Sequence, residues 1–128
     1  NIAGAIGMGA AVDWFSALDV NALHEHEQKL LAYATEQAEA FDGMRIIGTA
    51  PNKVGVLSFL LEGAHPEDVG FILDRQGVAI RTGDNCAQPL MKRFGIPGTA
   101  RASFSIYNTL EEVDSLFAAL KKAKMMLA

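Results

Sequence analysis

The chain has 128 residues, half of them hydrophobic, and 15 acidic residues against 11 basic ones give it a net charge of −4. A chain of this size buries roughly two-thirds of its unfolded surface, so one domain with one core is expected. Its basic residues are scattered, which argues against a nucleic-acid partner. No apolar run approaches the roughly 20 residues that span a bilayer, and no signal-peptide pattern is present, so we expect a soluble, cytoplasmic protein with no membrane partner.

The first predicted element is a helix from about Ile2 to Leu18. Its alanines, glycines and large apolar residues leave no polar stripe along one side, and a helix that is apolar all round is normally buried against another structure. The chain also does not begin with methionine. We therefore expect residues 1–128 to form the carboxyl-terminal small domain of a larger protein, with the helix of residues 1–18 packing on a domain that lies outside this sequence.

The next elements are a longer helix and a pair of strands. Asn21 is predicted to cap the helix, whose apolar residues recur at helical spacing as far as Phe41. The segments 44–48 and 54–61 read as strands, and the turn-rich residues 49–53 between them predict an antiparallel hairpin.

The remainder of the chain alternates between short helices and strands. We predict a helix that starts at His65-Pro66, a strand at 78–81, a helical turn at 90–94, a strand at 101–107 and a last helix that starts at Asn108-Thr109. The order is two helices followed by ββαβ(α)βα. This order predicts an α+β fold, in which helices cover one face of a small mixed or antiparallel sheet.

The single cysteine, Cys86, lies in the predicted strand-to-helix loop that starts at Arg81. It cannot form an internal disulfide, and no Cys/His spacing in the sequence resembles a metal site. A thiol near the start of a helical turn and near an arginine gains thiolate character and becomes a nucleophile. The alternative is that Cys86 packs as a small apolar residue, as free cysteines often do.

Two further kinds of residue could carry chemistry. Arg101 opens a predicted strand, where its guanidinium could clamp a substrate carboxylate or form a structural salt bridge. His24 and His26 are two positions apart and point to different sides of their helix, so both are expected on the solvated surface. His65 is expected to be a helix-start residue.

The segment around Cys86 reads Arg-x-Gly-x-x-Cys-Ala-x-Pro-Leu, and fifteen residues after the cysteine the chain reads Arg-Ala-Ser-Phe-Ser-Ile-Tyr-Asn-Thr-x-Glu-Glu-Val-Asp. These motifs resemble the signature of group II cysteine desulfurases, the SufS and selenocysteine lyase type among the class V aminotransferase-like enzymes that use pyridoxal phosphate. The resemblance covers the whole chain but only about the last third of an enzyme of that family. It implies the carboxyl-terminal domain of a fold-type I pyridoxal-phosphate enzyme.

The resemblance implies a role for three residues. Cys86 matches the nucleophile that takes sulfur from L-cysteine to give alanine and a persulfide for iron-sulfur cluster assembly. Arg101 matches the arginine that binds the substrate carboxylate, and Arg81 matches an arginine that lines the same pocket. Many members have two histidines directly before the cysteine, whereas this chain has Asp84-Asn85, so no role of those histidines is carried over.

The family holds pyridoxal phosphate on a lysine, commonly preceded by histidine, and no such pair occurs in this sequence. We therefore expect the cofactor to be bound by a missing amino-terminal domain, and residues 1–128 alone to be inactive. The resemblance further implies a sulfur-acceptor protein as partner and a homodimer. Three alternatives remain open: a selenocysteine lyase, another class V aminotransferase-like lyase or epimerase, and a stand-alone binding module of ACT-like build.

Overall fold

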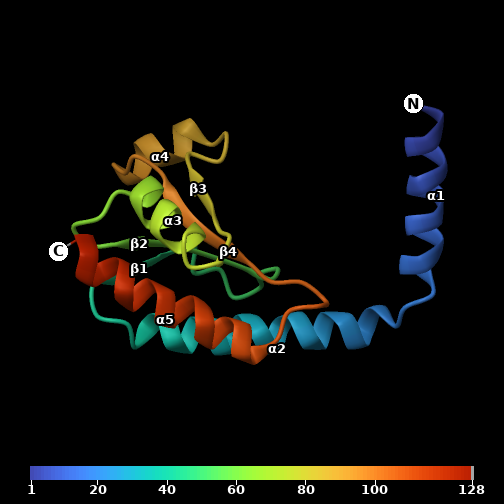
Figure 1. Cartoon of the computed structure of the whole chain (residues 1–128), viewed down its shortest axis with the longest axis horizontal. Coiled ribbons are helices and arrows are strands. Elements are labelled where there is room, and N and C mark those ends of the chain that lie inside the picture. The colour runs from blue at the N-terminus through green and yellow to red at the C-terminus, as the bar shows by residue number, and fades with distance from the viewer. Residues whose placement is uncertain (128) are drawn as a thin grey trace.

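The computed structural model describes residues 1–127 and shows a four-stranded sheet with helices packed on it (Figure 1). In chain order the elements are α1 (Ile2–Ser16), α2 (Val20–Glu39), β1 (Met44–Ile47), β2 (Val56–Leu61), α3 (Pro66–Asp74), β3 (Arg81–Gly83), α4 (Gln88–Phe94), β4 (Thr99–Ser103) and α5 (Leu110–Leu127). The strand order in the sheet is β1-β2-β4-β3. The predicted α+β fold is therefore confirmed.

All three strand pairs in the described sheet are antiparallel. In β1 and β2 Met44 pairs with Leu61, which gives the predicted hairpin, and β4 then lies between β2 and β3. Neighbouring residues of a strand point to opposite faces of a sheet. In β2 the buried and half-buried residues alternate in step with this geometry. The sheet thus has one face toward the core and one face without helices packed on it.

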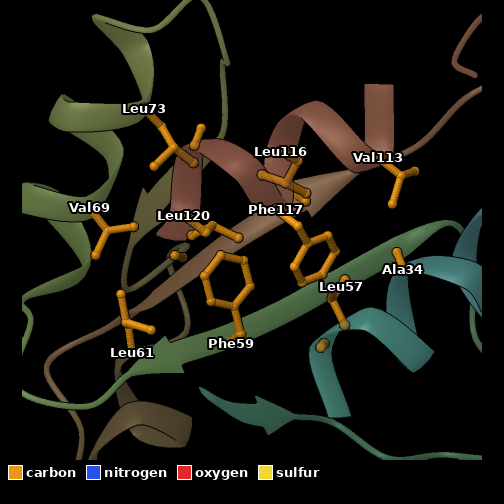
Figure 2. Packing of buried hydrophobic residues seen from close by; sticks show 14 of the residues in the cluster. Ala34, Leu57, Phe59, Leu61, Val69, Leu73, Val113, Leu116, Phe117 and Leu120 are labelled. Carbon is orange, nitrogen blue, oxygen red and sulfur yellow. The ribbon is translucent and has the colours of Figure 1, made fainter. Parts of the chain in front are cut away.

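The core lies between the inner face of the sheet and α2, α3 and α5 (Figure 2). Leu57 and Phe59 of β2 are both 0% exposed and lie against apolar side chains of the helices. The buried helix residues include Ala34 of α2, Leu73 of α3 and Leu120 of α5. Buried apolar residues recur at helical spacing within each of these helices. Each helix therefore has one apolar side, and all three pack on the same face of the sheet, as predicted.

Helix α1 stands apart from the sheet and its helices (Figure 1). None of its residues is buried, and Ile2, Ile6 and Trp14 expose 81%, 69% and 60% of their surface. The helix makes no core contacts. Its first turn is nevertheless regular, and Asn1 caps it by accepting a hydrogen bond from the Gly4 amide. Across residues 1–127, no helix is long and apolar enough to cross a membrane.

The structure corrects several local predictions. The cap of α2 is Asp19, whose carboxylate accepts hydrogen bonds from the Asn21 and Ala22 amides, rather than Asn21 itself. The third strand covers 81–83 instead of 78–81, and the fourth covers 99–103 instead of 101–107, because pairing with β4 and β2 sets the ends of these short strands.

His26 also departs from the expectation of a solvated surface. It is half-buried, and its Nε2 lies 2.9 Å from the carbonyl oxygen of Asn108, which links α2 to the turn before α5. His24 is exposed, as expected.

Candidate functional site

Cys86 lies in the four-residue connection between β3 and α4, and its side chain is exposed. Asn85 and Cys86 have φ angles of +53° and +58°, a left-handed conformation that is uncommon outside glycine. The Cys86 amide donates a 2.9 Å hydrogen bond to Oδ1 of Asp84. The alternative, that Cys86 packs as a small apolar residue, is therefore wrong, and the thiol is open to solvent.

The same hydrogen bond corrects one part of the sequence argument. The thiol's nucleophilic character was predicted to come partly from the start of the following helical turn, but the Cys86 amide is already bonded to Asp84. Helix α4 is also short, with seven residues, and its Ala87 cap provides no side-chain hydrogen bond. The charged groups that share the depression with the thiol are thus side chains, the Asp84 carboxylate and the Arg81 guanidinium, rather than a helix terminus.

Arg81 is held beside this loop by an amide side chain. Its Nε donates a 2.7 Å hydrogen bond to Oδ1 of Asn85. Nδ2 of Asn85 in turn donates to the Gly83 carbonyl at 3.1 Å and to the Thr99 hydroxyl at 3.3 Å. Thr99 belongs to β4 and is only 2% exposed, so the loop is tied to a buried part of the sheet.

Arg81 and Cys86 line one open depression of about 430 Å³, together with residues from three other segments. Its walls come from the start of α3, the end of β3, the cysteine loop and the segment before β4: His65, Pro66, Glu67, Arg81, Thr82, Gly83, Asp84, Asn85, Cys86, Pro97 and Gly98. The structure thus brings together two of the three predicted site residues, Cys86 and Arg81.

His65 and Glu67 are wall residues that the sequence did not predict. His65 caps α3, as expected, through Nδ1, which accepts a hydrogen bond from the Glu67 amide at 3.4 Å. The position of both residues depends on a close approach of α3 to β3, where a Cβ on Gly70 would lie 2.6 Å from Cγ2 of Thr82. A glycine in the middle of a predicted helix was the one available signal of that approach.

Arg101, the third predicted residue, lies on β4 and does not line the depression. It pairs with Ser58 of β2 on one side and with Arg81 of β3 on the other. Its neighbours Ala100 and Ala102 are buried in the core, so the Arg101 side chain projects from the opposite, open face. Its Nε is buried and has no hydrogen-bond partner among the described residues.

The described residues do not provide a complete cofactor or metal site. Within residues 1–127, no group of three histidine, cysteine, aspartate or glutamate side chains is arranged to hold a metal ion. None of the residues that line the Cys86 depression is a lysine. Lys124 instead pairs with Asp42 at 2.6 Å, and Lys53 donates to the Gly48 carbonyl. Lys124 and Lys53 are thus both engaged away from the Cys86 depression.

Two solved structures that match nearly the whole chain are of cysteine desulfurases. The structure of the cysteine desulfurase CsdA from Escherichia coli matches all of this chain with a TM-score of 0.92 and 34% identity, over 32% of the CsdA chain. The cysteine desulfurase from Thermococcus onnurineus NA1 matches 99% of this chain with a TM-score of 0.87 and 36% identity, over 31% of its own chain.

Curated relatives agree with the structural neighbours. A probable cysteine desulfurase from Xylella fastidiosa is 47% identical over 99% of this chain and 30% of its own length. The cysteine desulfurase from Synechococcus elongatus is 45% identical over 95% of this chain and 20% of its own length. The chain thus spans less than a third of the relatives it matches. The model of the aminotransferase class-V family matches residues 1–116. The chain therefore belongs to the aminotransferase class-V family.

Proposed function

We propose that this chain is the carboxyl-terminal small domain of a cysteine desulfurase and that Cys86 accepts sulfur from L-cysteine. The observation that carries the proposal is the exposed Cys86 thiol, which shares a depression with Arg81 on a loop tied to the sheet. The relatives and structural neighbours named above are all cysteine desulfurases and match nearly the whole chain. A buried, inert cysteine would not support this function.

In the proposed reaction the Cys86 thiolate attacks the sulfur of L-cysteine. A bond forms between the two sulfur atoms and the carbon–sulfur bond of the substrate breaks. The electron pair of that bond stays on carbon, which takes up a proton, so the products are alanine and a persulfide on Cys86. An exposed loop suits this step, because the thiol has to reach the substrate and afterwards present its sulfur to an acceptor.

Arg101 and Arg81 are proposed to bind the substrate carboxylate and to line the pocket, respectively. The buried Nε of Arg101 without a partner in the described chain supports this role, since an unpaired buried donor is costly unless a ligand or another segment accepts its hydrogen bond. A guanidinium also matches a carboxylate with two parallel hydrogen bonds. Both arginines project from the face of the sheet that carries no helix.

Pyridoxal phosphate is proposed to be held by a larger domain outside these residues. When bound, this cofactor supplies an electron sink for carbon–sulfur cleavage. The absence of a lysine from the walls of the Cys86 depression supports an external origin, as does the limited coverage of the relatives. The apolar, unburied α1 and the open face of the sheet are the surfaces that we propose pack against that domain.

The finer assignments follow from the sequence resemblance and remain proposals. They are membership of the group II type, a role in iron-sulfur cluster assembly, a sulfur-acceptor protein, a homodimer and a cytoplasmic location. An ACT-like binding module is not favoured, because the aminotransferase class-V match extends over residues 1–116.

The test is to supply the full-length protein with L-cysteine and to measure alanine and persulfide together. Equal amounts of alanine and Cys86-bound sulfur in a single turnover are expected. Release of alanine without sulfur on Cys86 would favour another class V lyase. Turnover of L-selenocysteine but not of L-cysteine would favour a selenocysteine lyase.

A further inference from the structure

Asn85 uses every polar atom of its side chain to connect three parts of the candidate site. Its Oδ1 accepts from Nε of Arg81 at 2.7 Å. Its Nδ2 donates to the Gly83 carbonyl at 3.1 Å and to the Thr99 hydroxyl at 3.3 Å. The buried Thr99 is a fixed point of β4, so Asn85 joins the end of β3, the sheet and the cysteine loop.

The backbone of Asn85 also sets the direction of the cysteine. With a φ of +53°, Asn85 is in the left-handed region, which asparagine tolerates better than other side chains do. Cys86 follows with a φ of +58°. Two successive left-handed residues turn the chain sharply, and the hydrogen bonds of the Asn85 side chain hold this turn on the sheet. The exposed position of the Cys86 thiol depends on that turn.

The hydrogen bond to Asn85 also determines where the Arg81 guanidinium lies. Arg81 is exposed, and a long exposed side chain samples many rotamers unless it has a partner. Within residues 1–127, the contact with Asn85 is its only side-chain hydrogen bond, and it engages Nε. Both terminal nitrogens of the guanidinium thus remain able to donate to a ligand in the depression that Arg81 shares with Cys86.

We propose that Asn85 is a positioning residue, which holds the Arg81 guanidinium and the Cys86 thiol in one fixed arrangement so that both act on the same substrate molecule. This inference rests on the function proposed above and deepens it. Asn85 stands where the sequence departs from the two-histidine pattern of the family that it resembles, so its role is read from its own contacts. It acts through Arg81 and Cys86 and not on the substrate itself.

The test uses the full-length protein with its cofactor and the variant Asn85→Gly. Glycine adopts the same φ without strain, so the substitution removes the side-chain hydrogen bonds and keeps the turn accessible. We expect kcat to fall by about tenfold or more, because small misplacements of reacting groups are costly, and KM to change little, because Arg101 is unaffected. Asn52→Gly, in the exposed β1–β2 connection, is the matched control and should keep parental kinetics.

A double-mutant cycle separates positioning through Arg81 from a purely structural role. Because part of the effect of Asn85 is proposed to pass through the guanidinium, Asn85→Gly should lower kcat less in the Arg81→Ala background than in the parent. Fully additive losses in the double variant would overturn the inference, as would parental kcat in Asn85→Gly. If Asn85→Gly does not fold, Asn85→Ala takes its place in the same cycle, since alanine also lacks the acceptor for Arg81 and both donated hydrogen bonds.

A readout that does not need turnover distinguishes failure of this inference from failure of the proposed function. The rate at which iodoacetamide alkylates Cys86 is followed on the Cys86 peptide by mass spectrometry, in protein without cofactor. We expect the alkylation rate to change several-fold in Asn85→Gly, because the turn that exposes the thiol loses its side-chain hydrogen bonds to the sheet, and to be unchanged in Asn52→Gly. Unchanged alkylation in Asn85→Gly would refute the positioning role, whereas altered alkylation of Asn85→Gly in a protein that releases no alanine from L-cysteine would refute only the desulfurase function.

Discussion

Arg81 and Arg101 are direct partners across the β3–β4 ladder, so two arginine side chains project side by side from the open face of the sheet. Like charges at directly opposite positions destabilise a sheet. Asn85 draws the Arg81 guanidinium toward the cysteine loop, whereas Nε of Arg101 stays buried without a partner in the described chain. The Arg101 guanidinium is thus the group left to receive a carboxylate, which would offset its charge.

Replacement of Arg101 by lysine should weaken substrate binding in the full-length protein. Lysine keeps the positive charge but loses the two-pronged geometry that matches a carboxylate. We expect KM for L-cysteine to rise by about tenfold, which corresponds to roughly 1.4 kcal/mol. Steady-state kinetics test this, with Arg45→Lys on the edge strand β1 as the control. An Arg101→Lys protein with parental KM would assign Arg101 to structure.

Replacement of Cys86 by alanine should abolish sulfur acceptance and leave cofactor binding intact, because the thiol is proposed as a nucleophile rather than a cofactor ligand. The cofactor absorbance and the amount of protein-bound persulfide after exposure to L-cysteine measure the two effects separately. Since the Cys86 side chain is exposed, the substitution should not change the melting temperature. Persulfide formation at the parental level in Cys86→Ala would contradict the proposed function.

The fold could be predicted from the sequence because local patterns and global packing agree. Alternation in β2 and helical spacing in α2 and α5 each identify a face, and these faces meet in one core. Short elements were less predictable. β3 has three residues and starts at Arg81, since its hydrogen bonds to β4 and not its own composition define it. The strand predicted at 78–81 was based on apolar residues there. In the structure Val78 and Ile80 belong to the connection after α3 and pack against the core without forming a strand.

The candidate site could be predicted only in part. Cys86 and Arg81 lie five residues apart in one loop region, so local sequence identified both. His65 and Glu67 lie about twenty residues earlier and reach the depression only through the packing of α3 on β3. The left-handed turn at Asn85 was also not predicted, because asparagine is compatible with several conformations and only its contacts select one.

Replacement of Gly98 by alanine should destabilise the sheet next to the site. A Cβ at this position would lie 2.7 Å from the carbonyl carbon and oxygen of Gly83, and these are backbone atoms that cannot rotate away. Overpacking of this kind typically costs about 1–3 kcal/mol. Urea denaturation measures the effect. Gly9→Ala, where nothing lies within 4 Å of the added Cβ, is the control and should not destabilise the fold. Equal urea midpoints for Gly98→Ala and Gly9→Ala would show that the backbone near Gly83 can move away from residue 98 without loss of stability.

The ion pair between Lys124 and Asp42 should make a small, pH-dependent contribution to stability. The hydrogen bond from Lys124 lowers the pKa of the Asp42 carboxyl below its ordinary value of 3.8. Because the folded pKa is depressed, this stabilisation is present above 3.8 and is lost as the pH falls through the lowered value. Urea midpoints of the parent and Asp42→Asn should differ above this range and converge below it. A pH-independent difference would assign the effect of Asp42 to something other than its charge.

Residues 1–128 expressed alone should self-associate through α1. Val12 and Trp14 are 54% and 60% exposed, and no residue of this apolar helix is buried in the described chain. Trp14 is the single tryptophan of the sequence, so its fluorescence reports directly on α1. We expect the emission maximum to shift to shorter wavelength as the protein concentration rises, with a parallel increase in sedimentation coefficient. The variant Ile6→Lys with Val12→Lys should remain monomeric and keep the emission of a solvent-exposed indole, because charged side chains on α1 oppose its burial. Concentration-independent fluorescence and a monomeric parent would show that α1 is stable in water without a partner.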